Sequence, residues 1–193
     1  PEDEDHPSSR ERDQLTRWLD DSITHFDYSK VRDPGYEPAR RLTSREYNNT
    51  VEDLFGIKGS FSSGFPQDLS GSSGFDNSAN TLFTTTLLLE RYIGAADAVL
   101  RTALPQPPRN EEEKKRRDAF FTVRPGQGVS QEKAARKLFE HFLPRAYRRP
   151  LEPVELEEAL ERFRNFRSDG RGFEAAAREV VRVVLISPKF LIK

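Results

Sequence analysis

The chain of 193 residues carries 31 basic and 32 acidic side chains, a formal net charge of −1, so it lacks the basic excess typical of nucleic-acid binding proteins. It contains neither cysteine nor methionine. Disulfides, thiolate metal sites, Cys-x-x-Cys-His haem attachment and an axial methionine ligand are therefore excluded within it. Because no apolar run approaches the roughly 18 residues that span a bilayer, we predict no direct membrane span.

The first residue is Pro1 and not methionine. We therefore expect the sequence to be a fragment or a processed part of a longer protein, with any export signal upstream.

The first helix is expected at residues 9–26. Ser8 and Glu11 have the spacing of a capping box, and apolar residues then recur at helical spacing: Leu15, Trp18, Leu19, Ile23 and Phe26. Residues 31–39 contain several prolines and a glycine, which predicts a turn-rich linker.

A second capping box, formed by Thr43 and Glu46, predicts a helix that Gly56 ends in a left-handed conformation. Asn48 and Asn49 are poor helix formers, so we expect their side chains to pin the loop that follows. That loop, residues 58–81, is rich in Gly, Ser, Asp and Asn and is long enough to suggest a functional role. Four apolar side chains are expected to fold it back onto the helices: Phe61, Phe65, Leu69 and Phe75.

Residues 84–104 form the clearest predicted helix, and the prolines that follow end it. Residues 111–117 fit either a short helix or a solvated hinge, and residues 120–129 are expected to be extended. Ser130 predicts the start of a further helix, which Pro144 should kink or restart.

Pro153 is expected to open the next helix at its first position. The last predicted helix covers residues 173–186 and ends at Ser187-Pro188. The predicted fold is all-α: a compact bundle of about six or seven helices with one long Gly/Ser/Asp-rich loop.

Few residues suggest chemistry. The three histidines, His6, His25 and His141, form no metal-binding pair, and His141 is expected in the core or at its rim. Asp68, Asp76 and Asn77 offer oxygens for Ca²⁺, although Asx turns explain the last two better.

Two segments resemble known families. Residues 40–56, RRLTSREYNNTVEDLFG, resemble the opening of a domain of unknown function in planctomycete-type multidomain cytochrome c proteins, and residues 65–66, 74–77 and 87–92 continue the likeness. Residues 146–150 and 184–191 resemble another domain of the same proteins. The lead, residues 1–26, is similar to the end of the haem domain that precedes them.

The resemblance implies an organisation for the chain. Residues 1–30 would be a remnant C-terminal helix of a haem-domain-like segment, residues 39–104 a first helical domain, residues 105–129 a linker, and residues 130–193 a second helical domain. Relatives are expected to carry two cysteines where this chain has Val123 and either Ala134 or Ala135, so apolar packing would replace a disulfide here.

From this resemblance we expect a non-catalytic structural or docking module, or an accessory subunit, in an exported, cytochrome c-associated electron-transfer assembly of a respiratory or photosynthetic membrane. Its partner would be a c-type cytochrome or a larger membrane-bound redox complex. It would lie in the periplasm or at the cell surface, alone or membrane-associated through partners, with no cofactor in this chain and no nucleic acid.

An alternative is a polysaccharide-active enzyme segment, with Asp53, Asp68 and Asp76 converging, or a carbohydrate- or calcium-binding module using the 58–81 loop. No catalytic residue is assigned. The candidate site residues have structural or interface roles and fall into one cluster beside the loop and a second pair near the C-terminus: Arg41, Tyr47, Asn48, Asn49, Asp53, Phe75, Asp76 and Asn77, then Arg148 and Arg149.

Overall fold

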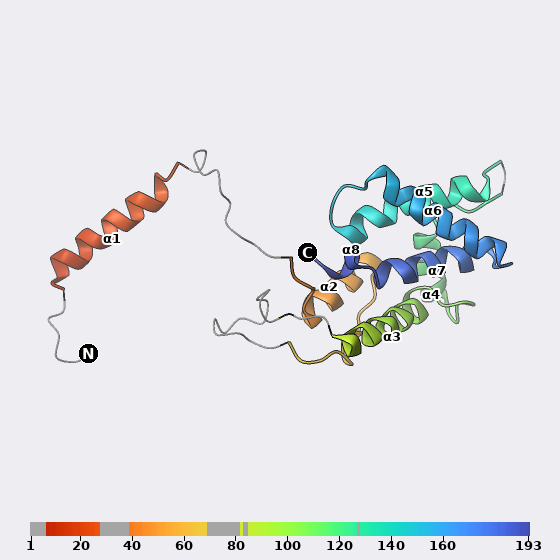
Figure 1. The fold of residues 1–193 in the computed structure, drawn as a ribbon, viewed down its shortest axis with the longest axis horizontal. Coiled ribbons are helices and arrows are strands. Elements are labelled where there is room, and N and C mark those ends of the chain that lie inside the picture. Colours follow the sequence, from red (N-terminus) through yellow and green to blue (C-terminus); the bar gives the residue numbers. More distant parts are fainter. Residues whose placement is uncertain (1–6, 28–38, 69–81, 83–84, 127) are drawn as a thin grey trace. The chain divides into compact units, whose positions relative to one another are not determined.

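The computed structural model describes residues 7–27, 39–68, 82, 85–126 and 128–193. The described residues form eight α-helices and no strand (Figure 1), which confirms the predicted all-α class. The chain divides into two compact units, residues 1–37 and residues 38–193.

The first unit contains α1 (Ser9–Thr24). The predicted capping box is present: the Ser8 hydroxyl accepts from the Glu11 amide, and the Glu11 carboxylate accepts from the Ser8 amide at 2.8 Å. None of its residues is buried. The apolar side chains that recur at helical spacing in this segment are exposed: Leu15, Trp18, Leu19, Ile23 and Phe26.

The second unit begins with α2 (Ser44–Phe55), which has the predicted Thr43 cap and ends at Gly56 with φ of 65°. Next comes α3 (Thr86–Ala103), capped by the Thr85 hydroxyl. The acidic-to-basic segment is a helix and not a hinge: α4 (Glu111–Phe120) starts where the Asn110 side chain accepts from the Glu113 amide at 2.9 Å.

No strand forms in the described part of the stretch expected to be extended, and only an isolated bridge joins Gly126 and Val129. Then α5 (Gln131–Tyr147) runs through Pro144 without a break, so a restart at that residue was a wrong expectation. Proline cannot donate a backbone hydrogen bond, but the helical conformation continues past it to Tyr147.

The final elements are α6 (Pro153–Ser168), α7 (Phe173–Leu185) and α8 (Pro188–Leu191). Pro153 opens α6 as predicted. The short α8 was not predicted: Ser187-Pro188 ends α7 but also begins a further turn, because proline is favourable at a first helical position.

One cluster of buried residues runs through the second unit, where α6 packs on α5 and α7, and α7 also contacts α3. It draws side chains from both predicted helical domains, from Leu42 to Leu191. Phe121, within the predicted linker, is also fully buried in it. The boundaries of the predicted domains stay a prediction.

Candidate functional site

The start of α2 carries a network of charged side chains. The Glu46 carboxylate accepts from the Thr43 amide at 2.9 Å, from both terminal nitrogens of Arg40 at 2.7 and 2.8 Å, and from Lys193 Nζ at 2.9 Å. These donors, Arg40 first, hold the pKa of Glu46 well below its ordinary value. The capping box is thereby tied to the C-terminal end of the second unit.

Arg41 forms a buried ion pair with Asp68. Its Nη2 lies 2.8 Å from Asp68 Oδ1, and the two side chains are only 5% and 10% exposed. A buried pair is costly unless further hydrogen bonds complete it, and here Asp68 Oδ2 also accepts from the Ser44 amide at 2.7 Å. Asp68 therefore anchors the loop to the first turn of α2.

Of the two asparagines expected to pin the loop, Asn48 does so and Asn49 is exposed. The Asn48 Nδ2 donates to Ser62 Oγ at 2.8 Å, and its Oδ1 accepts from the Ser62 amide at 3.1 Å. Phe61 and Phe65 are partly buried against the core, which confirms two of the four predicted anchors. Leu69 and Phe75 lie outside the described residues.

The structure describes five of the eight members of the first predicted cluster. Arg41 and Tyr47 are buried and Asn48 is half-buried beside the described part of the loop, whereas Asn49 and Asp53 are exposed. The remaining three predicted members, Phe75, Asp76 and Asn77, lie outside the described residues.

Arg148 closes the C-terminal end of α5. It adopts a left-handed conformation with φ of 57°, which is costly for a residue other than glycine. Its Nη2 donates to the carbonyls of Phe190 at 2.7 Å and Ile192 at 3.1 Å. The guanidinium thus holds α8 and the residue after it against α5.

Arg149 binds a buried carboxylate. Its two terminal nitrogens contact Glu155 at 2.6 and 3.0 Å, and Lys189 lies 3.0 Å from the same carboxylate. The Glu155 side chain is 2% exposed. The hydrogen bonds from Arg149 are the main reason that the pKa of Glu155 falls to about 2. The Glu152 amide and Lys189 lower the pKa further, whereas burial of the carboxylate opposes them.

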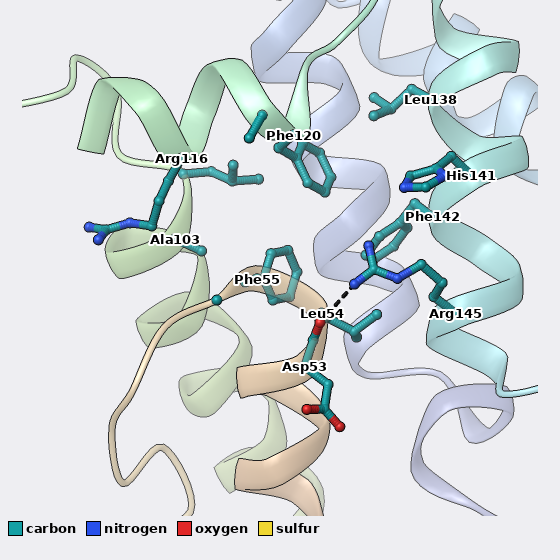
Figure 2. A pocket seen from close by; sticks show the side chains of 13 residues that line it. Asp53, Leu54, Phe55, Ala103, Arg116, Phe120, Leu138, His141, Phe142 and Arg145 are labelled. Carbon is teal, nitrogen blue, oxygen red and sulfur yellow. Dashed lines mark hydrogen bonds between the residues drawn. The ribbon is translucent and has the colours of Figure 1, made fainter. Parts of the chain in front are cut away.

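A cavity of about 240 Å³ lies where α2, α3, α4 and α5 meet (Figure 2). Phe55, Phe120 and Phe142, one each from α2, α4 and α5, line it with ring centroids 5.6 to 5.9 Å apart. His141 and Arg145, both exposed, stand one helical turn apart on α5 and face these rings (Figure 2).

Asp53 contributes its backbone to this cavity. Arg145 Nη2 donates to the Asp53 carbonyl at 2.7 Å, while the Asp53 carboxylate points away from the guanidinium (Figure 2). The Arg116 guanidinium also points away from the cavity (Figure 2) and pairs with Glu112 at 2.6 Å. Of the polar side chains that line the cavity, Arg145 and His141 are therefore the ones directed towards it; we call the part of the cavity beside them its mouth.

Sequence reasoning missed this cavity, although it placed His141 at the core or its rim. Each lining phenylalanine is an ordinary core residue by pattern, and the three are far apart along the chain. Only the one-turn spacing of His141 and Arg145 was readable in advance.

Within the described residues, no group of three or more His, Cys, Asp or Glu side chains could hold a metal ion. No helix among them is long and apolar enough to cross a membrane.

Two family models match the chain. Residues 40–105 match PSD3, a protein of unknown function (DUF1587), and residues 134–192 match PSD5, a protein of unknown function (DUF1595). Both are domains found in planctomycete cytochrome c-type multidomain proteins, and no haem domain is shown in this chain. No curated protein and no solved structure matches.

The matched segments are joined where the first begins and the second ends. Arg40 and Lys193 exchange both backbone hydrogen bonds at 3.0 and 2.9 Å, and the Leu42 amide donates to the Leu191 carbonyl at 2.8 Å. We call this pairing of residues 40–42 with residues 191–193 the terminal bridge. Both matched segments lie within the second compact unit.

Proposed function

We propose that the chain is a non-catalytic structural and docking module of an exported, cytochrome c-associated electron-transfer assembly. The two consecutive family matches carry this proposal, because both domains occur in cytochrome c-type multidomain proteins. The partner would be a c-type cytochrome or a larger membrane-bound redox complex, in the periplasm or at the cell surface.

The roles of the candidate residues support a structural function. Arg41, Asn48 and Asp68 tie the loop to α2, and Arg148 and Arg149 hold the C-terminal part of the second unit. The polysaccharide-active alternative expects Asp53, Asp68 and Asp76 to converge, and Asp76 lies outside the described residues. Of the other two, Asp68 is occupied by Arg41 and the Ser44 amide, and Asp53 is exposed.

The surface we propose for docking is the apolar face of α1. Within the first unit, its four large apolar side chains are 44% to 65% exposed: Leu15, Trp18, Leu19 and Ile23. An exposed apolar stripe that includes tryptophan commonly marks a protein interface. Charges of both signs on the rest of the helix favour a protein partner over an anionic membrane surface.

The test uses the chain, immobilised, as bait for a periplasmic extract of its own host. Eluted proteins are separated and stained for covalently bound haem. We expect haem-stained partners with the natural chain and a clear loss with Trp18→Ser combined with Leu19→Ser. A Val154→Ser variant, also at an exposed apolar side chain, is the matched control.

Two results would count against the proposal. Absence of any haem-stained protein with the natural chain would overturn the docking function. Equal recovery with the double variant would overturn α1 as the docking surface.

A further inference from the structure

The cavity between α2, α3, α4 and α5 has two chemically distinct parts. Its wall is apolar, with the three phenylalanine rings joined by Leu54, Leu104 and Leu138. Its mouth carries the guanidinium of Arg145 and the imidazole of His141 (Figure 2). Such a site suits a ligand with an apolar body and one polar head.

Arg145 is available to a ligand. Two nearby arginines, Arg136 on α5 and Arg149 just after it, pair with Glu157 and Glu155 at 2.6 Å. Among the described residues, Arg145 contacts no carboxylate, and its guanidinium donates to the backbone carbonyl of Asp53. A guanidinium has five N–H donors in a planar fork and is always charged, so donors remain for a bidentate anion.

The cavity limits the size of the ligand. Pockets for drug-sized molecules have volumes of roughly 300 to 1,000 Å³, whereas this cavity has about 240 Å³. One aromatic ring or a short alkyl chain is compatible with that space, and a nucleotide or a two-chain lipid is not.

We propose that this cavity binds a small monocarboxylic acid, with its ring or alkyl chain among Phe55, Phe120 and Phe142 and its carboxylate at Arg145 and His141. A carboxylate matches the planar fork of arginine. This inference concerns a different surface from α1 and does not depend on the docking function.

The first experiment titrates phenylacetate and hexanoate into the isotope-labelled full chain and follows backbone amide signals by NMR. Phenylacetamide is the matched probe, because it keeps the shape and removes the charge. We expect both carboxylates to shift the signals of Phe55, Ala119 and His141, with phenylacetamide binding at least about tenfold more weakly, as loss of a charge-assisted hydrogen bond requires.

Variants then assign the binding to the cavity. Arg145→Gln should weaken phenylacetate binding about tenfold, and Ala119→Phe should block the cavity, because Ala119 lines it and is exposed. Arg136→Gln, on the same helix but outside the lining, should bind like the natural chain. Circular dichroism and thermal unfolding of each variant check that it is folded.

Four outcomes would overturn the proposal. Two concern the probes: no shifted signal at the solubility limit of either carboxylate, or equal binding of phenylacetamide and phenylacetate. Two concern the variants: full affinity for phenylacetate in a folded Arg145→Gln variant, or equal losses of affinity in the Arg136→Gln and Arg145→Gln variants. Equal losses would mean that general positive charge, and not this site, attracts the probe.

Discussion

Tyr47 illustrates a buried polar atom without a partner. Its ring is fully buried, 5.0 Å from Phe65 and about 6 Å from Tyr92 and Phe190. Among the described residues its hydroxyl has no hydrogen-bond partner, and burial raises the pKa of the phenol. Burying an unpaired hydroxyl costs roughly 1 to 3 kcal/mol.

We therefore predict that Tyr47→Phe keeps or increases the free energy of unfolding, by up to about 2 kcal/mol. Tyr47→Leu removes the aromatic contacts and should lower it by about 2 kcal/mol or more. Urea denaturation followed by circular dichroism measures both. A loss above about 1 kcal/mol in Tyr47→Phe would show that the hydroxyl is stabilising.

Glu155 should make stability sensitive to acid. Its pKa is about 2 in the folded chain and about 4.3 in an unfolded one. The unfolded chain therefore binds the proton more readily, and acidification favours unfolding. The stabilisation is complete above about pH 5 and is lost as the pH falls towards 2.

In Glu155→Gln this dependence should flatten between about pH 5 and pH 2, with lower stability at neutral pH because Arg149 loses its charged partner. Thermal unfolding at a series of pH values measures the slope. Glu161→Gln, an exposed position on the same helix, is the control. Equal slopes in the two variants would refute the assignment to Glu155.

At the scale of the element, replacing two helix glycines by alanine should change stability in opposite directions. Gly56 ends α2 with φ of 65°, whereas Gly94 lies within α3 without a positive φ, and a Cβ at either would meet nothing within 4 Å. The backbone conformation alone then decides whether alanine raises or lowers the free energy of unfolding. We expect Gly56→Ala to lower the free energy of unfolding by about 1 kcal/mol and Gly94→Ala to raise it by about 0.5–1 kcal/mol.

Chemical denaturation of both variants under one set of conditions tests the pair. If both changed stability in the same direction, backbone conformation would not be the controlling factor.

Helices and their starts were the most predictable elements, because caps are encoded locally. Thr43 with Glu46, and Pro153, each marked a helix start that the structure contains. The hinge-or-helix alternative at α4 could not be settled from sequence, because part of its support is distant: Arg117 reaches Glu174 on α7 at 2.7 Å. The unbroken passage of α5 through Pro144 likewise depends on packing.

At the scale of the whole molecule, sequence patterns identified residues but not their partners. The Asn48 pin on the loop was predictable, because two asparagines in a helix need compensation. The Arg41–Asp68 pair, the aromatic cavity and the terminal bridge each join segments distant in sequence, and no local pattern encodes such a contact. The terminal bridge matters most, because it joins the PSD3 and PSD5 segments where one begins and the other ends.

The terminal bridge can be weakened by removing one backbone N–H group. Lys193→Pro removes the amide that donates to the Arg40 carbonyl at 2.9 Å, while Ile192 already has the extended conformation favoured before proline. Lys193→Ala keeps that amide and removes only the ammonium bound to Glu46. We expect the proline variant to be less stable than the alanine variant by about 1 kcal/mol.

Hydrogen exchange locates the effect. The Arg40 amide, which donates to the Lys193 carbonyl at 3.0 Å, should exchange faster in Lys193→Pro than in Lys193→Ala, while amides within α6 keep their protection. Because the bridge connects segments that also share one core, both variants should still unfold in a single transition. Two separate transitions in the proline variant would mean that the bridge, and not the shared core, makes the PSD3 and PSD5 segments unfold together.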